Sequence, residues 1–351
     1  MSVPVEQSGN TVLPRGLSIL LGLAAAVVVV LGLRSASGLL GPIILALVLV
    51  VVVAPVSHWL QRKGLPGWLA ASIAILTIYV ILIGMIVSLV VSAARLAELI
   101  PSYVPQMNDL INQGAQKLAD FGVDNAQISR IASSLDVGKV VSIVTSILSG
   151  LVSVLSGIFL VALLALFMAF DAAGFPRVLD RVAEQRPEAV TALRSFAHGT
   201  RRYFVVSAVF GLIVAVFDMI ALQWIGIAGV VVWGILSFVT NFIPNVGFVI
   251  GLVPPALLGL LDKGWGGLIA VVVAYTVINT LIQTLIQPKI VGDTIGLSAT
   301  LTFISLLFWA WALGALGALL AIPMTLLVKA ILVDVDPDNQ WVGPLLSGKS
   351  R

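Results

Sequence analysis

Long apolar stretches alternate with short polar ones along the whole 351-residue chain. Apolar runs of 18 residues or more recur, and a run of this length is enough for a helix to cross the hydrocarbon of a bilayer. The first four spans are expected at residues 16–33, 38–60, 68–93 and 140–170. The pattern predicts an all-α, polytopic helical membrane protein with about eight transmembrane segments.

The composition supports a membrane protein and excludes several other classes. The chain is 60% hydrophobic and 10% charged, whereas soluble domains average about 45–50% and about 25%. It has no cysteine, which excludes disulfides, thiol nucleophiles and thiolate metal sites. The sequence also lacks the motifs of phosphate-binding loops, zinc proteases and serine hydrolases. We therefore expect no enzyme activity, no metal site, no cofactor and no nucleic-acid partner.

The charges between the spans indicate an orientation, because short cytoplasmic loops are rich in Lys and Arg. Loop 61–67 holds Arg62 and Lys63 without an acid, and region 171–203 holds six arginines against four acids. Region 94–139 has four basic and five acidic residues, so it is expected outside. Both chain termini are then cytoplasmic. Apolar positions recur at helical spacing in both polar regions, which predicts amphipathic helices there.

The apolar region after residue 204 is repeatedly interrupted. Stretches 228–262 and 297–332 are each broken near the middle, and each follows a helix that carries polar residues. Both contain a Gly-Gly-Pro series, and related Ser and Pro positions recur at offsets of 68 and 69 residues, namely Ser237 with Ser305 and Pro254 with Pro323. Each stretch fits either a re-entrant hairpin or a pair of spans. Two hairpins would form an inverted repeat, and matched interruptions of this kind indicate the binding site of a transporter.

The first interruption places amide side chains beside a proline. Asn241 and Asn245 flank Pro244, and an unwound turn in hydrocarbon is tolerated only where protein or water covers its backbone. One interpretation is that this turn contacts a polar solute near mid-membrane, with Gly247 and Gly251 close by. The alternative is that the Asn side chains only cap the broken helix ends.

Polar side chains also lie inside two expected spans. Asn279, Gln283 and Gln287 share one helix face at i, i+4 and i+8, which indicates either a solute pathway or hydrogen bonds between helices. Asp218 is the one acid inside an expected span. Because an acid at a helix centre costs about 2.5–3.5 kcal/mol on insertion scales, it marks an ion or proton pathway unless it reaches the outer interface.

Two C-terminal motifs resemble a known family. NFIPNVGFVIGLVPPALLGL and QPKIVGDTIGLSATLTFISLLFWAWALGALGALLAIPM are similar to the two signatures of the AI-2E family, which is named for an autoinducer-2 exporter. The resemblance covers residues 15–333 and implies a secondary transporter of small solutes in the bacterial cytoplasmic membrane. It implies no single substrate, because some relatives are associated with signal export and others with sodium–proton exchange. Asn245 and Phe248 depart from the family pattern.

The sequence as a whole predicts a solute exporter that works by alternating access. Its transport core is expected at residues 204–332, with the solute site formed by Asn241, Pro244, Asn245, Gly247, Gly251, Asn279, Gln283 and Gln287 and an ion-coupling site at Asp218. The expected partners are the lipid bilayer, a small solute, H+ or Na+, and further copies of the chain in a homo-oligomer. One alternative is a cation–proton antiporter that uses Asp218. Another is a non-transporting membrane scaffold.

The remaining segments receive supporting roles in this interpretation. Residues 1–93 hold three scaffold spans and 140–170 the fourth span. Residues 94–139 form an extracytoplasmic amphipathic segment, 171–203 a cytoplasmic basic amphipathic segment, and 333–351 a cytoplasmic tail.

Overall fold

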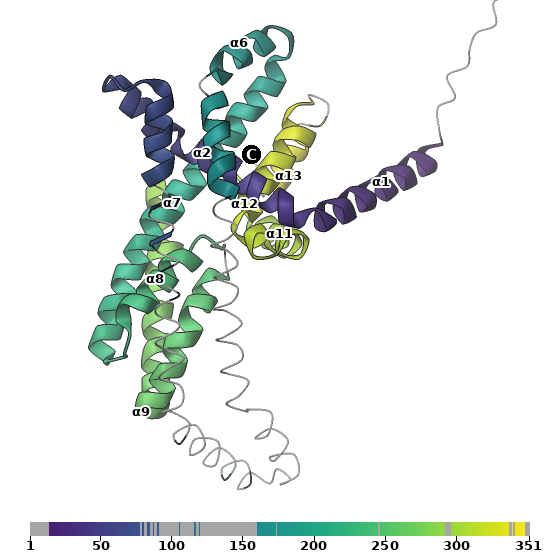
Figure 1. Cartoon of the computed structure of the whole chain (residues 1–351). Coiled ribbons are helices and arrows are strands. Elements are labelled where there is room, and N and C mark those ends of the chain that lie inside the picture. Colours follow the sequence, from purple (N-terminus) through teal and green to yellow (C-terminus); the bar gives the residue numbers. More distant parts are fainter. Residues whose placement is uncertain are drawn as a thin grey trace, which may run out of the picture.

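Every regular element that the structure describes is a helix, so the expected all-α polytopic membrane fold is confirmed (Figure 1). This computed structural model describes residues 14–77, 160–172, 174–244, 246–291, 296–336, 339 and 341–347, with isolated positions between 79 and 119. Within these ranges, four helices are long and apolar enough to cross a membrane, or five if the bent pair Leu160–Ala172 and Phe175–Gln185 is one span. The count of about eight segments stays a prediction, since most of 78–159, including the expected outer segment 94–139, lies outside the described residues.

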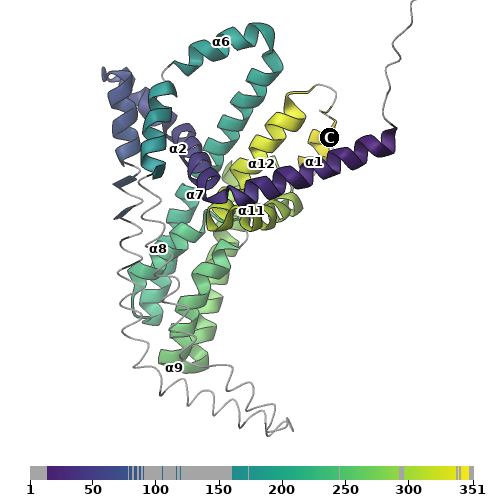
Figure 2. The ribbon, with the colours of Figure 1, turned by 45° about the vertical axis from the view of Figure 1, so that its right-hand side comes forward.

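The N-terminal helices α1 (Arg15–Ser35) and α2 (Ser37–Arg62) are almost entirely apolar. Figure 2 shows α1 extending away from the rest of the molecule, and most of its side chains are exposed. Its last turn is held by Arg34, whose guanidinium carbon lies 4.6 Å from the ring centre of Trp311, within the range of a cation–π interaction. α2 instead packs on helices 67–77 and 160–172 through small and branched side chains: Ala46, Val53, Ala71, Ala74, Ile75, Val161, Ala165 and Ala169.

The long helix α7 (Pro187–Ile225) supports the C-terminal half. It follows α6 (Phe175–Gln185) and begins at Pro187, a residue that suits the first helical position because its missing N–H has no partner there anyway. It ends at Gly226, whose φ of 77° is left-handed and favours glycine. α7 contacts α2, α8, α9 and α12, so both interrupted stretches pack on it.

The first interrupted stretch is a helical hairpin. α8 (Val230–Thr240) and α9 (Gly247–Asn279) are separated by the interruption predicted around Pro244. At the open end of the hairpin, Lys263 Nζ would lie only 3.1 Å from a Cβ added to Gly226. The interruption itself lies at the other end, where Tyr203 of α7 reaches Phe242. The interruption is therefore the tip of a hairpin whose two ends meet near the end of α7.

α9 itself folds back at Gly264. The φ of 67° and ψ of −156° at this residue are non-helical and belong to a region that is essentially restricted to glycine. Gly259 and Gly267 then face each other, since a Cβ on Gly259 would lie 2.8 Å from the Gly267 carbonyl oxygen. α9 is therefore two antiparallel arms, 247–263 and 265–279. The second arm continues through the π-helix η1 (Thr280–Ile286) into α10 (Gln287–Val291).

The second interrupted stretch folds back in the same way. α11 (Ala299–Leu319) reverses at Gly314, with φ 68° and ψ −147°. A Cβ added to Gly317 would collide with the Trp309 carbonyl group, so the two arms of α11 are in close contact. The return arm runs on through α12 (Ala321–Lys329) and the π-helix η2 (Ala330–Asp334), and α13 (Val342–Ser347) follows.

The two turns match each other position by position. Gly259, Gly264 and Gly267 in α9 correspond to Trp309, Gly314 and Gly317 in α11. These two turns lie 50 residues apart (264 to 314), and they are a different pair of positions from the Ser and Pro residues that recur at offsets of 68 and 69. Figure 2 shows α9 at one end of the molecule, with α11 and α12 displaced toward the other.

The tip of the first hairpin packs against the second. Ile243 and Val246 contact the buried cluster that contains Trp309 and Leu320, and α2 contributes Val48 to the same cluster. The two interruptions therefore share one apolar contact, although they lie far apart in the sequence.

We predict that Gly264→Ala destabilises the protein by about 1–3 kcal/mol, because the backbone conformation at this position is strained for any residue with a Cβ. Gly266→Ala is the matched control. Neither glycine has another atom within 4 Å of an added Cβ, but only Gly264 has a positive φ. Thermal unfolding of both variants in detergent, followed by tryptophan fluorescence, checks this. Equal midpoints for the two variants would show that the turn does not depend on glycine.

Candidate functional site

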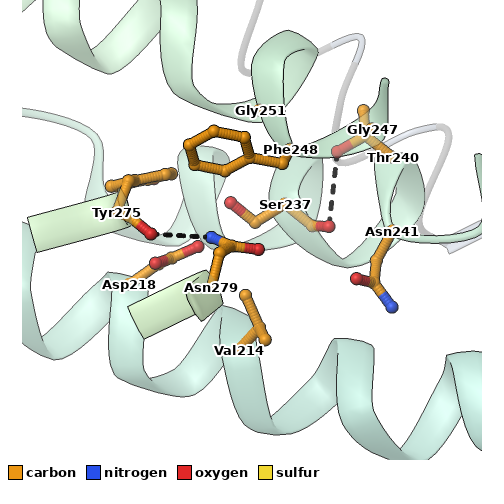
Figure 3. A pocket seen from close by; sticks show the side chains of 10 residues that line it. All are labelled: Val214, Asp218, Ser237, Thr240, Asn241, Gly247, Phe248, Gly251, Tyr275 and Asn279. Atoms are coloured by element: carbon orange, nitrogen blue, oxygen red, sulfur yellow. Dashed lines mark hydrogen bonds between the residues drawn. The ribbon is translucent and has the colours of Figure 1, made fainter. Parts of the chain in front are cut away.

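A small polar cavity lies where α7, α8 and the two arms of α9 meet (Figure 3). It has room for about one water molecule. Two lining residues, one turn apart, come from α7. Three come from α8 and its C-terminal end, and the remaining five come from the two arms of α9. The lining residues are Val214, Asp218, Ser237, Thr240, Asn241, Gly247, Phe248, Gly251, Tyr275 and Asn279.

Gly247 and Gly251, which the sequence placed at the solute site, line this cavity as positions of close helix approach. A Cβ on Gly251 would lie 3.2 Å from Thr240 Oγ1 and 3.3 Å from Ser237 Oγ. One on Gly247 would collide with the Thr240 carbonyl oxygen. The two glycines therefore let the first arm of α9 lie directly against the hydroxyl-bearing face of α8.

Three amide side chains connect the tip of the first hairpin to the second arm of α9. Gln283 Nε2 donates to Asn241 Oδ1 and to Asn279 Oδ1, at 2.7 Å in each case. Asn241 Nδ2 donates to the Ser207 carbonyl oxygen and Asn279 Nδ2 to the Tyr275 carbonyl oxygen, both at 2.9 Å. Gln283 lies in the π-helix η1, a form often found at functional sites. In this state the amides are paired with one another and with the backbone.

Tyr203 covers the interruption itself. Its hydroxyl donates to the Phe242 carbonyl oxygen at 2.7 Å. This hydrogen bond gives a partner to one of the backbone groups that the break leaves unpaired. The ring of Phe204 lies 5.8 Å from that of Phe242 and keeps the turn apolar on its other side. An unpaired carbonyl in hydrocarbon would cost several kcal/mol, so these contacts explain why the break is tolerated.

Asp218 faces the protein interior rather than an interface. Its side chain is 0% exposed, and neither carboxylate oxygen has a hydrogen-bond partner among the described groups. Ion pairs in the described part of the chain lie elsewhere, between Arg194 and Asp180 and between Lys329 and Asp334. A buried carboxylate without a paired cation is costly.

Two hydroxyl groups, one from α8 and one from α9, lie beside Asp218. Ser237 Oγ and Tyr275 Oη are buried and also lack a hydrogen-bond partner. The Ser237 hydroxyl lies next to both the Asp218 carboxyl group and the Tyr275 hydroxyl. Figure 3 shows the three residues reaching the cavity from α7, α8 and α9.

The structure brings together Asp218, Asn241, Gly247, Gly251 and Asn279 of the expected site residues as cavity lining. Gln283 joins them through its hydrogen bonds. Pro244 lies in the turn after α8 and Gln287 at the start of α10, and neither lines the cavity. Asn245 lies outside the described residues.

The sequence did not assign Ser237, Thr240 or Tyr275 to the site. Tyr275 lies one turn before Asn279 on the polar stripe of α9, so a signal was present. The two hydroxyl residues of α8 gave none, because Ser and Thr in apolar helices commonly bond their own backbone. Thr240 does this with the Leu236 carbonyl oxygen at 2.9 Å.

The model of the AI-2E family transporter matches residues 17–335. The chain belongs to the AI-2E transporter family. It is therefore a multi-pass membrane transporter, as the motif resemblance implied, and the match covers both interrupted stretches and α7.

Several curated relatives align over most of their length. The AI-2 transport protein TqsA of Escherichia coli K12 is 28% identical over 336 residues, which is 96% of this chain and 97% of the relative. The putative transport protein YhhT of the same organism is 27% identical over 90% of each chain. A sodium-lithium/proton antiporter of Halobacillus andaensis is 26% identical over 80% of this chain and 85% of the relative. All three names describe transport rather than catalysis.

We predict that Tyr203→Phe lowers the free energy of unfolding by about 1–3 kcal/mol, because it leaves the half-buried Phe242 carbonyl oxygen without this donor. Tyr79→Phe is a matched control, since the Tyr79 hydroxyl is buried and has no partner among the residues that the structure describes. Thermal unfolding in detergent measures both. Indistinguishable midpoints would contradict the role given to Tyr203.

Proposed function

We propose that this protein is a secondary transporter that exports a small polar solute by alternating access. The observation that carries the proposal is a cavity lined by six polar side chains within an otherwise apolar helical core, beside an interrupted hairpin. Most of these side chains are neutral donors and acceptors, which suit a small uncharged solute. An autoinducer-2-like molecule or another small metabolite fits this chemistry, and the naming of TqsA as an AI-2 transport protein supports it.

Glycine turns mark the ends of the unit that moves. Gly226, Gly229 and Gly264 all have positive φ, at 77°, 77° and 67°, and they enclose α8 and the first arm of α9. The cavity holds about one water molecule, so a larger solute enters only when this unit separates from α7. Hinges at a few positions that flank a rigid element are a common route to such movement. The contact through Ile243 and Val246 carries the movement to the second hairpin.

The dimensions of the first hairpin support a re-entrant arrangement. α8 has 11 residues, which rise about 16 Å, against about 30 Å for the hydrocarbon core. Trp224 and Trp265 are 87% and 60% exposed and lie near the open end of the hairpin, as expected of residues at a membrane interface. We place this end outside, both chain termini in the cytoplasm, and the protein in the bacterial cytoplasmic membrane. The exposed apolar surface of α1 is then available to lipid and to further copies of the chain.

We predict that Asn241→Ala, Asn279→Ala and Gln283→Ala each reduce export at least ten-fold, because each removes amide donors and acceptors at the cavity. Gln223→Ala, at an exposed position of α7, is the control and should export normally. The measurement compares exported metabolites between a deletion strain and strains that express each variant at equal membrane levels. Unchanged export by all three site variants would contradict the proposed solute site.

Cation–proton exchange is the second candidate function. The observation that favours it is the complete burial of Asp218 without a partner, and an antiporter occurs among the relatives. The coupling ion would be H+ or Na+. A non-transporting scaffold is disfavoured by the match to a transporter family.

We predict that Asp218→Asn abolishes Na+- and Li+-dependent proton movement in everted membrane vesicles, because the amide carries no exchangeable negative charge. The near-isosteric replacement keeps the shape of the buried side chain, so assembly should be unaffected. A pH-sensitive dye reports the exchange, and vesicles without the protein give the background. Exchange at the wild-type rate in this variant would exclude Asp218 as the coupling group.

A further inference from the structure

The six polar side chains that line the cavity fall into two groups. Thr240, Asn241 and Asn279 are all paired within the protein: Thr240 Oγ1 with the Leu236 carbonyl oxygen, Asn241 and Asn279 with Gln283 and with backbone oxygens. Asp218, Ser237 and Tyr275 are the other group. Their side-chain oxygens are buried and have no partner among the described groups. The unpaired oxygens are thus concentrated at one position instead of being spread around the wall.

Burial at this position is nearly complete. Asp218 is 0%, Tyr275 1% and Ser237 6% exposed. Most buried polar atoms in folded proteins have a hydrogen-bond partner, so three adjacent side chains without one require an explanation. Solvent does not reach them, and the neighbouring amides are already occupied.

The chemistry of the three side chains is that of a cation site. They offer two carboxylate oxygens and two hydroxyl oxygens, and hard cations prefer oxygen ligands. Each hydroxyl can turn its proton toward the carboxylate while one lone pair faces a cation. The single negative charge of Asp218 matches a monovalent ion, and no other carboxylate lines the cavity to hold a second positive charge.

We propose that Asp218, Ser237 and Tyr275 bind one dehydrated monovalent cation of the size of Na+ or Li+, and that a proton on Asp218 competes with it. Space for about one water molecule admits Na+ or Li+ without its hydration shell and excludes an organic cation. The proposal rests on the ion-coupled form of the proposed function and names the ligands of its ion. It also gives Ser237 and Tyr275 a role that the sequence did not assign to them.

Competition with a proton follows from the groups that surround the site. Of the residues lining the cavity, Asp218 and Tyr275 are the only two that titrate, and no Lys, Arg, His or second acid lines it. The Asp218 carboxylate is therefore the group that changes charge as the pH falls. Cation and proton then exclude each other, which is the relation that an exchanger needs between its two ions.

Cation-dependent stabilisation of the purified full-length protein in detergent tests the site. A ligand that binds only the folded protein raises the midpoint of thermal unfolding. NaCl and LiCl should each raise the midpoint in a saturable manner, relative to choline chloride at the same ionic strength. The Na+ concentration for half-maximal stabilisation should rise as the pH is lowered, approaching ten-fold per pH unit once Asp218 is mostly protonated.

Hydroxyl deletions give the most specific readout. Ser237→Ala and Tyr275→Phe should each raise the half-maximal Na+ concentration about ten-fold, since each removes one ligand of a charged group. The midpoint of each variant in choline is its own reference, so that any loss of the contacts of Ser237 with Asp218 and Tyr275 does not enter the comparison. Thr200→Val and Tyr79→Phe are the matched controls: both hydroxyls are equally buried and unpartnered, but neither lines the cavity. Asp218→Asn should abolish the Na+ effect.

Two results would overturn the proposal. One is the same unfolding midpoint in Na+, Li+ and choline at every pH, which would leave the cavity to a water molecule or to a permanently protonated Asp218. The other is a Na+ response in Ser237→Ala and Tyr275→Phe that is no weaker than in the two controls. Both hydroxyl variants decide the question even if Asp218→Asn fails to fold. Export that persists without any cation effect would reject this site alone, and cation binding by a protein that exports nothing would reject only the solute proposal.

Discussion

A backbone surrounded by hydrocarbon cannot leave its polar groups unpaired, and the C-terminal half of this protein depends on that constraint. At the interruption around Pro244, side chains of neighbouring helices reach the gap. Tyr203 of α7 donates to Phe242, Asn241 reaches back to Ser207, and Gln283 holds Asn241 from the opposite side. The length of α7 matters for the same reason, because one continuous helix presents Tyr203 and Ser207 at the tip of the hairpin and Asp218 further along.

The polar side chains of this region fall into two groups that differ in their hydrogen bonding. The amides near the tip bind the break and one another, which makes them part of the support as well as candidates for solute contact. The group around Asp218 lies deeper between the helices and has no such structural partner. A set of satisfied hydrogen bonds therefore lies beside a small group of buried oxygens that have no partner among the described residues. Removing an amide near the hairpin tip therefore breaks hydrogen bonds within the protein, whereas removing a hydroxyl beside Asp218 removes an oxygen without a partner among the described residues.

The sequence predicted the helices better than it predicted the contacts between them. Hydropathy predicted the helical membrane fold, and Pro244 with its flanking amides located the first interruption correctly. Asn279 and Gln283, which the sequence placed on one polar helix face, are half-buried and hydrogen-bonded to each other. The contact between Asp218 and Ser237 had no sequence signal, because it depends on how α8 crosses α7. The glycine turns at Gly264 and Gly314 also had no signal in the Ser and Pro spacings, because they are defined by backbone conformation.

The matched turns have a consequence for how distant relatives can be aligned. In both, the glycine at the reversal is followed three positions later by a second glycine, Gly267 or Gly317, that has no room for a side chain against the opposite arm. The two glycines therefore form a short G-x-x-G motif. The surrounding stretch is uniformly apolar, so its hydropathy alone does not determine where two chains align. Aligning chains of this architecture on the G-x-x-G motif fixes the register of both arms. A bulky residue at the second glycine indicates a chain whose arms must lie further apart.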